Sequence, residues 1–152
     1  MPAKFDIRAA TLGDAVWFST RLREADRLEV EAACGKDVET ALRHAVQASA
    51  LAWVASKNGL PIVLLGCADF TPGVGSPWLM ATDEALRLGP ALTALAKERV
   101  ALVRKTWPKL LNYVDARNLV SVRWLKRIGF KIHETVPYGV NDEPFHPFSM
   151  GA

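Results

Sequence analysis

The stretch from Asn112 to Phe130 constrains the fold most, because nineteen residues hold a strand, a turn, a helix and a helix stop. Leu110–Asp115 is apolar and rich in β-favouring residues, which predicts a buried strand. Asn118 is placed to cap a helix with its side-chain oxygen. Gly129 can end that helix in the left-handed conformation, and Phe130 can then fold back on the last turn. Four apolar residues at helical spacing predict one buried face: Val120, Trp124, Leu125 and Ile128.

The N-terminal residues predict a strand followed by a helix. Lys4–Ala9 alternates apolar and polar residues, as a strand with one buried face does. Thr11 and Asp14 have the spacing of a capping box, so we expect a helix from Gly13 to a break near Gly35. Two sets of side chains are predicted on opposite faces of this helix. Those facing inward are Trp17, Phe18, Leu22 and Ala25; those facing outward are Arg21, Arg23, Glu24, Asp26, Arg27, Glu29 and Glu31.

A second helix and a β-hairpin follow. Asp37 can cap a helix over Val38–Ala48. Leu51–Ala55 and Pro61–Phe70 read as strands, and the intervening Asn58-Gly59 pair is typical of a tight hairpin turn, because both residues tolerate positive φ angles. We therefore predict an antiparallel pair of strands.

The second half of the chain predicts further strands around one long helix. Thr71–Pro77 is rich in glycine and proline, which favours a loop, and Pro77–Thr82 reads as the next strand. A helix is expected from Gly89 or Pro90 to Lys105. After the Asn112–Phe130 stretch, Lys131–Val136 and Phe145–Met150 are expected to form the last two strands.

The composition is that of a folded domain. The chain has 152 residues, of which 50% are hydrophobic and 23% charged. Its 19 Lys and Arg residues are interspersed with 16 Asp and Glu residues, which argues against a nucleic-acid-binding stripe. The start, MPAKFDIRAA, lacks the apolar core of a signal peptide, and the apolar run Leu60–Ala68 is too short to span a bilayer. We expect a soluble, cytoplasmic protein.

The two cysteines predict neither a disulfide nor a metal site. Cys34 and Cys67 lack the paired spacing of metal ligands, both to each other and to the three histidines. Reduced thiols are the expectation for a cytosolic chain. No metal ligand is assigned.

The residue order around Asn118 resembles the fifth strand and fourth helix of the GCN5-related N-acetyltransferase (GNAT) superfamily. A small residue follows three positions on (Ser121), apolar residues six and seven on, and Gly-Phe eleven and twelve on. An ordinary capped helix between two strands explains the same periodicity. The predicted order of elements is also the one expected of this fold. The resemblance implies a single α/β (α+β) domain over residues 1–152, with a central mixed sheet of about seven strands and about four flanking helices.

The same resemblance implies acetyl-CoA as cofactor and an amine as acceptor. The family holds the pyrophosphate at the start of the helix after the fourth strand, where amide hydrogens and the helix dipole favour an anion. This stretch is one residue shorter than the family pattern here, and Pro90 has no amide hydrogen. A structural helix start explains Gly89 and Pro90 equally well, and capping and packing explain Asn118 and Ser121. The positions that match cofactor-binding positions are Thr82, Arg87, Gly89, Ala91, Asn118 and Ser121.

Catalysis would need a base, because an alkylamine with a pKa of about 10.4 is largely protonated at neutral pH. Asp83 and Glu84, at the exit of the fourth strand, are the carboxylates that the family's geometry favours, and surface or capping roles are the alternative. The family's usual proton donor, a tyrosine seven residues after the asparagine, is replaced by Leu125. The Arg23–Glu31 series is expected either to border the acceptor or to form a solvated helix face.

Several segments together also resemble a small family of phage-encoded acetyltransferase-like proteins, which includes an internal virion protein of short-tailed phages. The shared region runs from the LREADRLEV stretch to the C-terminus. The resemblance implies an alternative, non-catalytic function with phage assembly or host proteins as partners, in the host cytoplasm or the virion. Two functions therefore stay open, an N-acetyltransferase and a phage protein that keeps the fold without turnover. The segments are WLMATDEA, NYVDARN, RWLKRIGF, PYG and FHPF.

Overall fold

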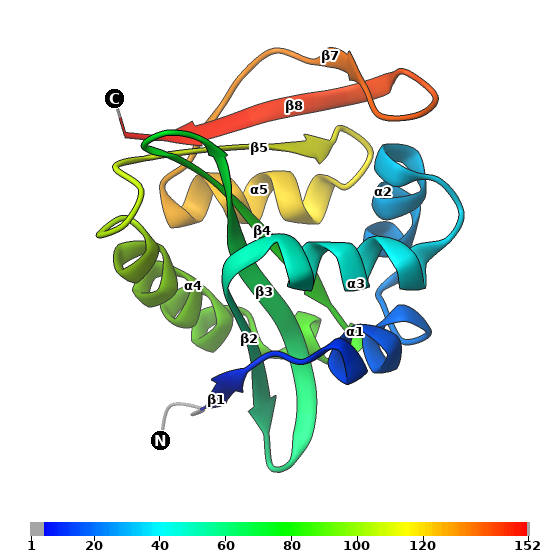
Figure 1. Cartoon of the computed structure of the whole chain (residues 1–152), viewed down its shortest axis with the longest axis vertical. Coiled ribbons are helices and arrows are strands. Elements are labelled where there is room, and N and C mark those ends of the chain that lie inside the picture. Colours follow the sequence, from blue (N-terminus) through cyan, green and yellow to red (C-terminus); the bar gives the residue numbers. More distant parts are fainter. Residues whose placement is uncertain (1–4, 152) are drawn as a thin grey trace.

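A computed structural model describes residues 5–151 and shows one eight-stranded mixed sheet with helices on both faces (Figure 1). The predicted fold class is confirmed, with one strand and one helix more than expected. The strand order is β1-β2-β3-β4-β5-β8-β6, with β7 paired to β8. The strands are β1 Asp6–Ala9, β2 Ser49–Lys57, β3 Leu60–Thr71, β4 Val74–Ala81, β5 Lys109–Asp115, β6 Lys131–Ile132, β7 Val136–Tyr138 and β8 Glu143–Met150. The helices are α1 Leu12–Ser19, α2 Glu24–Cys34, α3 Val38–Ala48, the 3-10 helix η1 Asp83–Leu88, α4 Gly89–Val103 and α5 Leu119–Ile128.

The two faces of the sheet are covered by different helices, as the alternation of side chains along the strands requires. Val54 and Leu64 are paired neighbours on β2 and β3 and pack with Phe18 of α1 and Leu42 of α3. The next residues along these strands point to the other face, where Leu65 packs with the α4 helix. We call these the α1–α3 face and the α4–α5 face.

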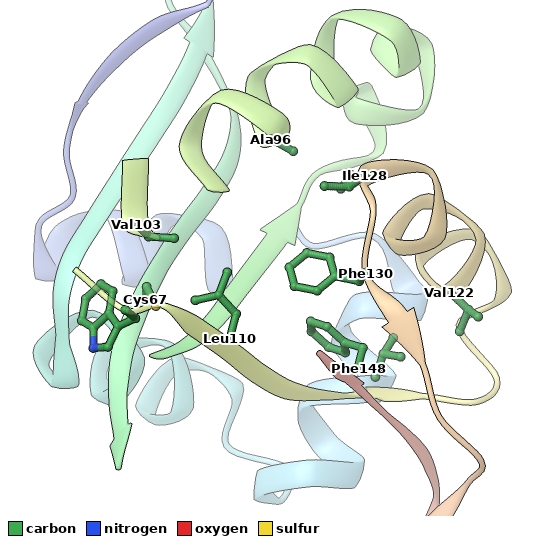
Figure 2. Packing of buried hydrophobic residues seen from close by; sticks show 10 residues of the cluster. Cys67, Ala96, Val103, Leu110, Val122, Ile128, Phe130 and Phe148 are labelled. Atoms are coloured by element: carbon green, nitrogen blue, oxygen red, sulfur yellow. The ribbon is translucent and has the colours of Figure 1, made fainter. Parts of the chain in front are cut away.

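The stretch from Asn112 to Phe130 folds as predicted, with one exception. Asn118 accepts a hydrogen bond from the amide of Ser121, and Gly129 ends α5 with φ 119° while the Phe130 amide donates to the Leu125 carbonyl. Phe130 then meets Phe148 edge-on in the core beneath α5, which Figure 2 shows from close by. Val120, expected inward, is exposed.

Val122 takes the buried place that Val120 was expected to hold. Around the helix axis, Leu125 lies about 60° from Val122 and about 140° from Val120, so Val122 joins the buried stripe and Val120 does not. The buried stripe includes Trp124, Leu125 and Ile128, as predicted. The helix was therefore predicted correctly, and its first buried position was not.

Three other predictions needed correction. The expected helix from Gly13 to Gly35 is two helices, because the chain breaks at residues 20–23 and Arg23 adopts an extended ψ of 142°. The expected loop Thr71–Pro77 is mostly strand: Gly73, at φ 78°, makes a tight turn and β4 starts at Val74. The expected strand Lys131–Val136 is divided between β6 and β7, which pair with different parts of β8.

Other expectations are confirmed closely. Asp37 caps α3 over the predicted residues. Thr11 and Asp14 form the capping box of α1. Asn58 and Gly59 both have positive φ in the β2–β3 hairpin. Lys4, the first residue of the predicted N-terminal strand, lies outside the described residues. Within residues 5–151, no helix is both long and apolar enough to cross a membrane.

The β4 and β5 strands pair only where they begin. These parallel neighbours are in register at Val74 with Lys109 and at Gly75 with Leu110. Beyond these pairs the strands diverge, so that β5 runs across the upper part of Figure 1, below β8, while β4 runs down the molecule. The Asn112 side chain donates a 2.6 Å hydrogen bond to the Pro77 carbonyl near the start of this gap. The divergence leaves an opening in the middle of the sheet.

The turn between β7 and β8 is fixed against the end of α2. The Val140 amide donates to the Ala32 carbonyl at 3.1 Å. Gly139 lies so close that a Cβ there would be 2.2 Å from the same oxygen, and its φ is 81°. We expect Gly139→Ala to lower the free energy of unfolding by roughly 2–4 kcal/mol through overpacking and backbone strain. Chemical denaturation measures this change.

Gly73→Ala is the matched control for that prediction. Gly73 has a similar φ of 78°, but nothing lies within 4 Å of the place its Cβ would occupy. This variant should therefore show the cost of a left-handed alanine alone, about 1–2 kcal/mol. Equal losses in the two variants would contradict the predicted clash with α2.

Candidate functional site

A cavity of about 310 Å³ occupies the gap between β4 and β5 and is lined from both faces of the sheet. Leu79, Val100 and Trp124 line it on the α4–α5 face. Leu42 and Met80 line it on the α1–α3 face. Its walls are mainly apolar. The cavity therefore reaches both faces of the sheet, and its few polar groups stand out.

Glu29 of α2 is the only carboxylate among the described lining residues. Its Oε1 atom accepts hydrogen bonds from the Asp115 amide, at 2.9 Å, and from Asn118 Nδ2, at 3.3 Å. Among residues 5–151 no group donates a hydrogen bond to Oε2. One oxygen thus anchors the carboxyl to β5 and α5, while the other is left free.

The pKa of Glu29 is raised to about 8. The main cause is burial, which removes water from the charged form, and the neighbouring Asp26 carboxylate adds like-charge repulsion. Hydrogen bonds from the Asp115 amide and Asn118 oppose the shift. A carboxyl with this pKa exchanges its proton near neutral pH, which suits a general base.

Asp26 and Arg23 bind the end of β4. The Ala81 amide donates to Asp26 Oδ2 at 2.9 Å, and the Arg23 amide donates to the Ala81 carbonyl at 2.8 Å. Arg23 Nη1 lies 3.6 Å from Asp26 Oδ1, and both side chains are buried. Burial raises the pKa of Asp26, while the Arg23 charge opposes that shift. The α2 helix therefore supplies the hydrogen-bonding partners that a neighbouring strand would otherwise give to Ala81.

Asn118 joins these groups into one cluster. Its Nδ2 donates to Asp26 Oδ1 at 3.2 Å and to Glu29 Oε1, while its Oδ1 accepts from Arg23 Nη2 at 3.2 Å and from the Ser121 amide at 3.4 Å. The amide thus uses both donor hydrogens and accepts two bonds, which fills its capacity. We call Arg23, Asp26, Glu29 and Asn118 the Asn118 cluster.

The residues predicted as base or phosphate ligands lie at the exit of β4, outside the cavity lining. Asp83 is exposed, and Glu84 lies 3.9 Å from Arg87, whose side chain is 80% exposed. All three belong to η1, which runs directly into α4, so the expected phosphate loop is itself helical. Thr82 is buried, and its hydroxyl donates to the Ile62 carbonyl at 3.3 Å.

The other predicted cofactor ligands are divided between α4 and α5. Gly89 and Ala91 are partly exposed at the start of α4, and nothing lies within 4 Å of the place a Gly89 Cβ would occupy. Ser121 lines the cavity, and Asn118 lies buried beside it. The structure thus brings the two α5 residues to the cavity and leaves the η1 residues apart from it.

The sequence analysis placed Arg23, Asp26 and Glu29 on the outward face of a helix and left two roles open, a border of the acceptor site or a solvated face. The outward, solvated placement is wrong for these three residues. Arg23 and Asp26 are buried, and Glu29 lines the cavity. One signal was present: Asp26, Glu29, Val30 and Ala33 have the i, i+3, i+4, i+7 spacing of a single helix face. Two carboxylates on the same stripe as Val30 and Ala33 indicate buried acids with bonded partners.

Two further groups at the cavity are unusual. Arg99 Nε is buried with no hydrogen-bond partner within residues 5–151, and its guanidinium lies 5.1 Å from the Trp53 ring centre. Cys34 is exposed at the cavity on the other face. Cys67 is buried, and burial raises its pKa to about 12. No group of three or more His, Cys, Asp or Glu residues within the described chain could hold a metal ion.

Comparison with known proteins places the chain by its fold. No protein-family model and no curated protein sequence matches it. Among solved structures, the aminoglycoside acetyltransferase AAC(6')-Ib in complex with ribostamycin and coenzyme A is similar, with TM-score 0.73, 19% identity, and 97% of this chain and 93% of that chain covered.

Two further structures are similar over nearly the whole of both chains. A chimera of the Vibrio cholerae spermidine N-acetyltransferase SpeG and hSSAT has TM-score 0.74 and 13% identity, and the match covers 97% of this chain and 95% of that one. A GNAT-family acetyltransferase from Streptococcus pneumoniae has TM-score 0.65 and 17% identity, with 97% and 98% covered. The chain therefore has the GNAT acetyltransferase fold.

Proposed function

We propose that the protein is an acetyl-CoA-dependent N-acetyltransferase that acts on an amine. The observation that carries the proposal is the cavity that reaches both faces of the sheet through the β4–β5 gap, with Glu29 on one side. Direct transfer of the acetyl group requires acetyl-CoA and the amine to be bound at the same time, with their reacting atoms in contact. The two ligands must therefore enter from different sides. A gap open to both faces meets that requirement. Solved structures of the same fold include several that hold coenzyme A or acetyl-CoA.

The cofactor would enter from the α4–α5 face. The start of α4, at Gly89 and Ala91, would meet the pyrophosphate with the positive end of the helix dipole, with Arg87 and Thr82 close by in the chain. Ser121 would contact the pantetheine arm inside the cavity. Arg99 Nε, a buried donor without a partner among the described residues, would find an acceptor in a carbonyl of that arm.

Asn118 would act on the cofactor only indirectly. Its side chain already makes four hydrogen bonds within the Asn118 cluster and has no free donor. It would instead hold the Glu29 carboxyl at the mouth of the gap. The predicted cofactor role of Asn118 thus becomes a positioning role in this proposal.

The chemical step follows from these positions. The neutral amine nitrogen attacks the thioester carbonyl carbon, the new C–N bond forms, and the amine proton moves to Glu29 Oε2. The C–S bond would then break, the thiolate would leave with the bonding electron pair and take a proton from water, and Glu29 would return its proton to the resulting hydroxide. Asp83 and Glu84 are the alternative bases from the sequence. Their position outside the cavity lining favours Glu29.

Cofactor binding is tested by thermal denaturation with acetyl-CoA. A ligand at about 100 times its Kd should stabilise the folded protein by about 2.7 kcal/mol, since it binds only the native state. For a chain of this size that raises the melting temperature by roughly 5–10 °C. Adenosine diphosphate at the same concentration is the control and should give a smaller shift. No shift with millimolar acetyl-CoA would contradict the proposal.

The alternative function is a phage virion or host-interaction protein that keeps the fold without turnover. Two features favour it: Pro90, which removes an amide at the expected phosphate site, and Leu125, which replaces the family's usual tyrosine. The binding test, followed by a thiol-release assay, separates the two functions. Binding of acetyl-CoA followed by thiol release with an amine supports the enzyme, whereas binding without release over a broad amine panel supports the alternative.

A further inference from the structure

We propose that the acceptor is a small primary amine carried on an apolar, preferably aromatic, body, bound on the α1–α3 face of the cavity. This inference rests on the proposed function, because it names the class of amine that the same cavity would accept. Three observations carry it: the chemistry of the walls, the single free carboxylate, and the volume.

The α2 and α3 walls on this face offer mainly apolar surface. Val30, Ala41 and Leu42 contribute aliphatic contacts from α2 and α3. Trp78 packs against β3, where a Cβ at Gly66 would be 2.9 Å from its ring. Its indole nitrogen already donates to Ser49 Oγ at 2.7 Å. The ring therefore presents carbon surface to a ligand.

The opposite wall is aromatic. Tyr113 and Tyr138 stack with ring centres 4.1 Å apart and planes inclined by 15°, and Tyr138 also meets Phe145 at 5.0 Å. All three residues line the cavity. Aromatic pairs of this kind attract a further ring more strongly than area alone explains, by about 0.5–1.5 kcal/mol. A ligand with an aromatic body fits these contacts.

The charge of the site suits one ammonium group. Asp26 is bonded to the Ala81 amide and Asn118, and Asp115 is paired with Arg117 at 2.7 Å. These carboxylates are already compensated, which leaves Glu29 Oε2 free. A polyamine would have to bury its remaining ammonium groups against apolar walls, and unpaired buried charge is costly. Spermidine and ribostamycin, which are named with the similar structures, carry several amino groups.

The volume limits the size of the acceptor. The cavity measures about 310 Å³ and must also receive the reacting end of the cofactor. Ligand sites are usually about 300–1,000 Å³, so this one lies at the small end. A single ring with a short amine-bearing chain is the size that remains.

Cys34 makes binding measurable without turnover. It is exposed at the cavity, whereas Cys67 is buried with a pKa raised to about 12, so a thiol reagent should label Cys34 alone in the folded protein. We expect 2-phenylethylamine to slow this labelling at least tenfold at saturation. Spermidine should not slow it. Phenylacetate, with the same ring and the opposite charge, is the matched control and should not protect either.

The same amines are then compared as acceptors in a thiol-release assay with acetyl-CoA. We expect kcat/KM for 2-phenylethylamine to exceed that for spermidine by about 100-fold. The reason is that the additional ammonium groups of spermidine would be buried in the site without partners. Ala45→Glu adds a carboxylate to the α3 wall, and it should narrow this ratio at least tenfold if the wall contacts the acceptor.

The outcomes separate this inference from the proposed function. If spermidine protects Cys34 and is the better substrate while acetyl-CoA still stabilises the protein, the acceptor class is wrong and the enzyme stands. If acetyl-CoA gives no stabilisation, the proposed function fails. Protection of Cys34 by 2-phenylethylamine alone would then still support the amine site, and its absence would overturn that site too.

Discussion

Replacing Glu29 by glutamine should lower kcat by about 10²–10⁴-fold, the usual contribution of a positioned general base. Glutamine retains the oxygen that accepts from the Asp115 amide and Asn118, so the fold should survive. Stabilisation by acetyl-CoA should be unchanged, because Glu29 lies on the acceptor side. Glu24→Gln, on the exposed face of the same helix, is the control and should keep full activity. A Glu29→Gln enzyme within threefold of the wild type would exclude Glu29 as the base.

The pH dependence gives an independent check on the same residue. Because the base must be ionised and its pKa is raised to about 8, kcat/KM should climb with pH and level off above that value. Stability should change in the opposite sense. A carboxyl whose folded pKa exceeds its unfolded value favours folding most at low pH, and this contribution is lost as pH rises from about 4.5 through 8. Glu29→Gln should remove that loss.

Replacing Asn118 by alanine should have the largest effect on stability. The change removes four hydrogen bonds and leaves the buried Arg23 and Asp26 and the half-buried Glu29 without this partner. Removing one partner from a buried charged group costs about 3–5 kcal/mol. The melting temperature should therefore fall by roughly 6–20 °C, measured by circular dichroism or calorimetry.

Two further variants show how that loss is divided. Asn118→Ser keeps an oxygen that can cap α5 through the Ser121 amide, so it should recover about 1 kcal/mol relative to Asn118→Ala. Asn141→Ala removes an exposed asparagine and should change stability by less than about 0.5 kcal/mol. If Asn118→Ala lowered the free energy of unfolding by no more than the loss of a helix cap does, the hydrogen bonds to Arg23, Asp26 and Glu29 would contribute nothing to stability.

Much of the fold could be predicted because its signals are local. The Asn118 cap, the Gly129 stop and the Asn58-Gly59 turn each depend on residues within a few positions of one another, and each is confirmed. The break in the chain at residues 20–23 was missed because its cause is not local. Arg23 is extended there because its amide bonds to Ala81, far away in the sequence.

The candidate site could be predicted only in part, since its partners are distant along the chain. Asn118 was identified, but Glu29 meets Asp115 across 86 residues and Arg23 meets Asn118 across 95. No periodicity contains such pairings. Two acids on the same helix face as Val30 indicate that this face is buried. The helix pattern does not indicate which strand ends will form hydrogen bonds with the acids. The roles of Asp83, Glu84 and the α4 residues stay predictions until a ligand is bound.

The short pairing of β4 with β5 has a mechanical consequence. Only two residue pairs of the strands are in register, so a ladder of main-chain bonds does not fix the angle between the two blocks of the sheet. Instead α2 braces it, holding Ala81 on one block through Asp26 and Asp115 on the other through Glu29. A displacement of α2 must stretch bonds to both blocks at once. The width of the opening between β4 and β5 therefore depends on the position of α2.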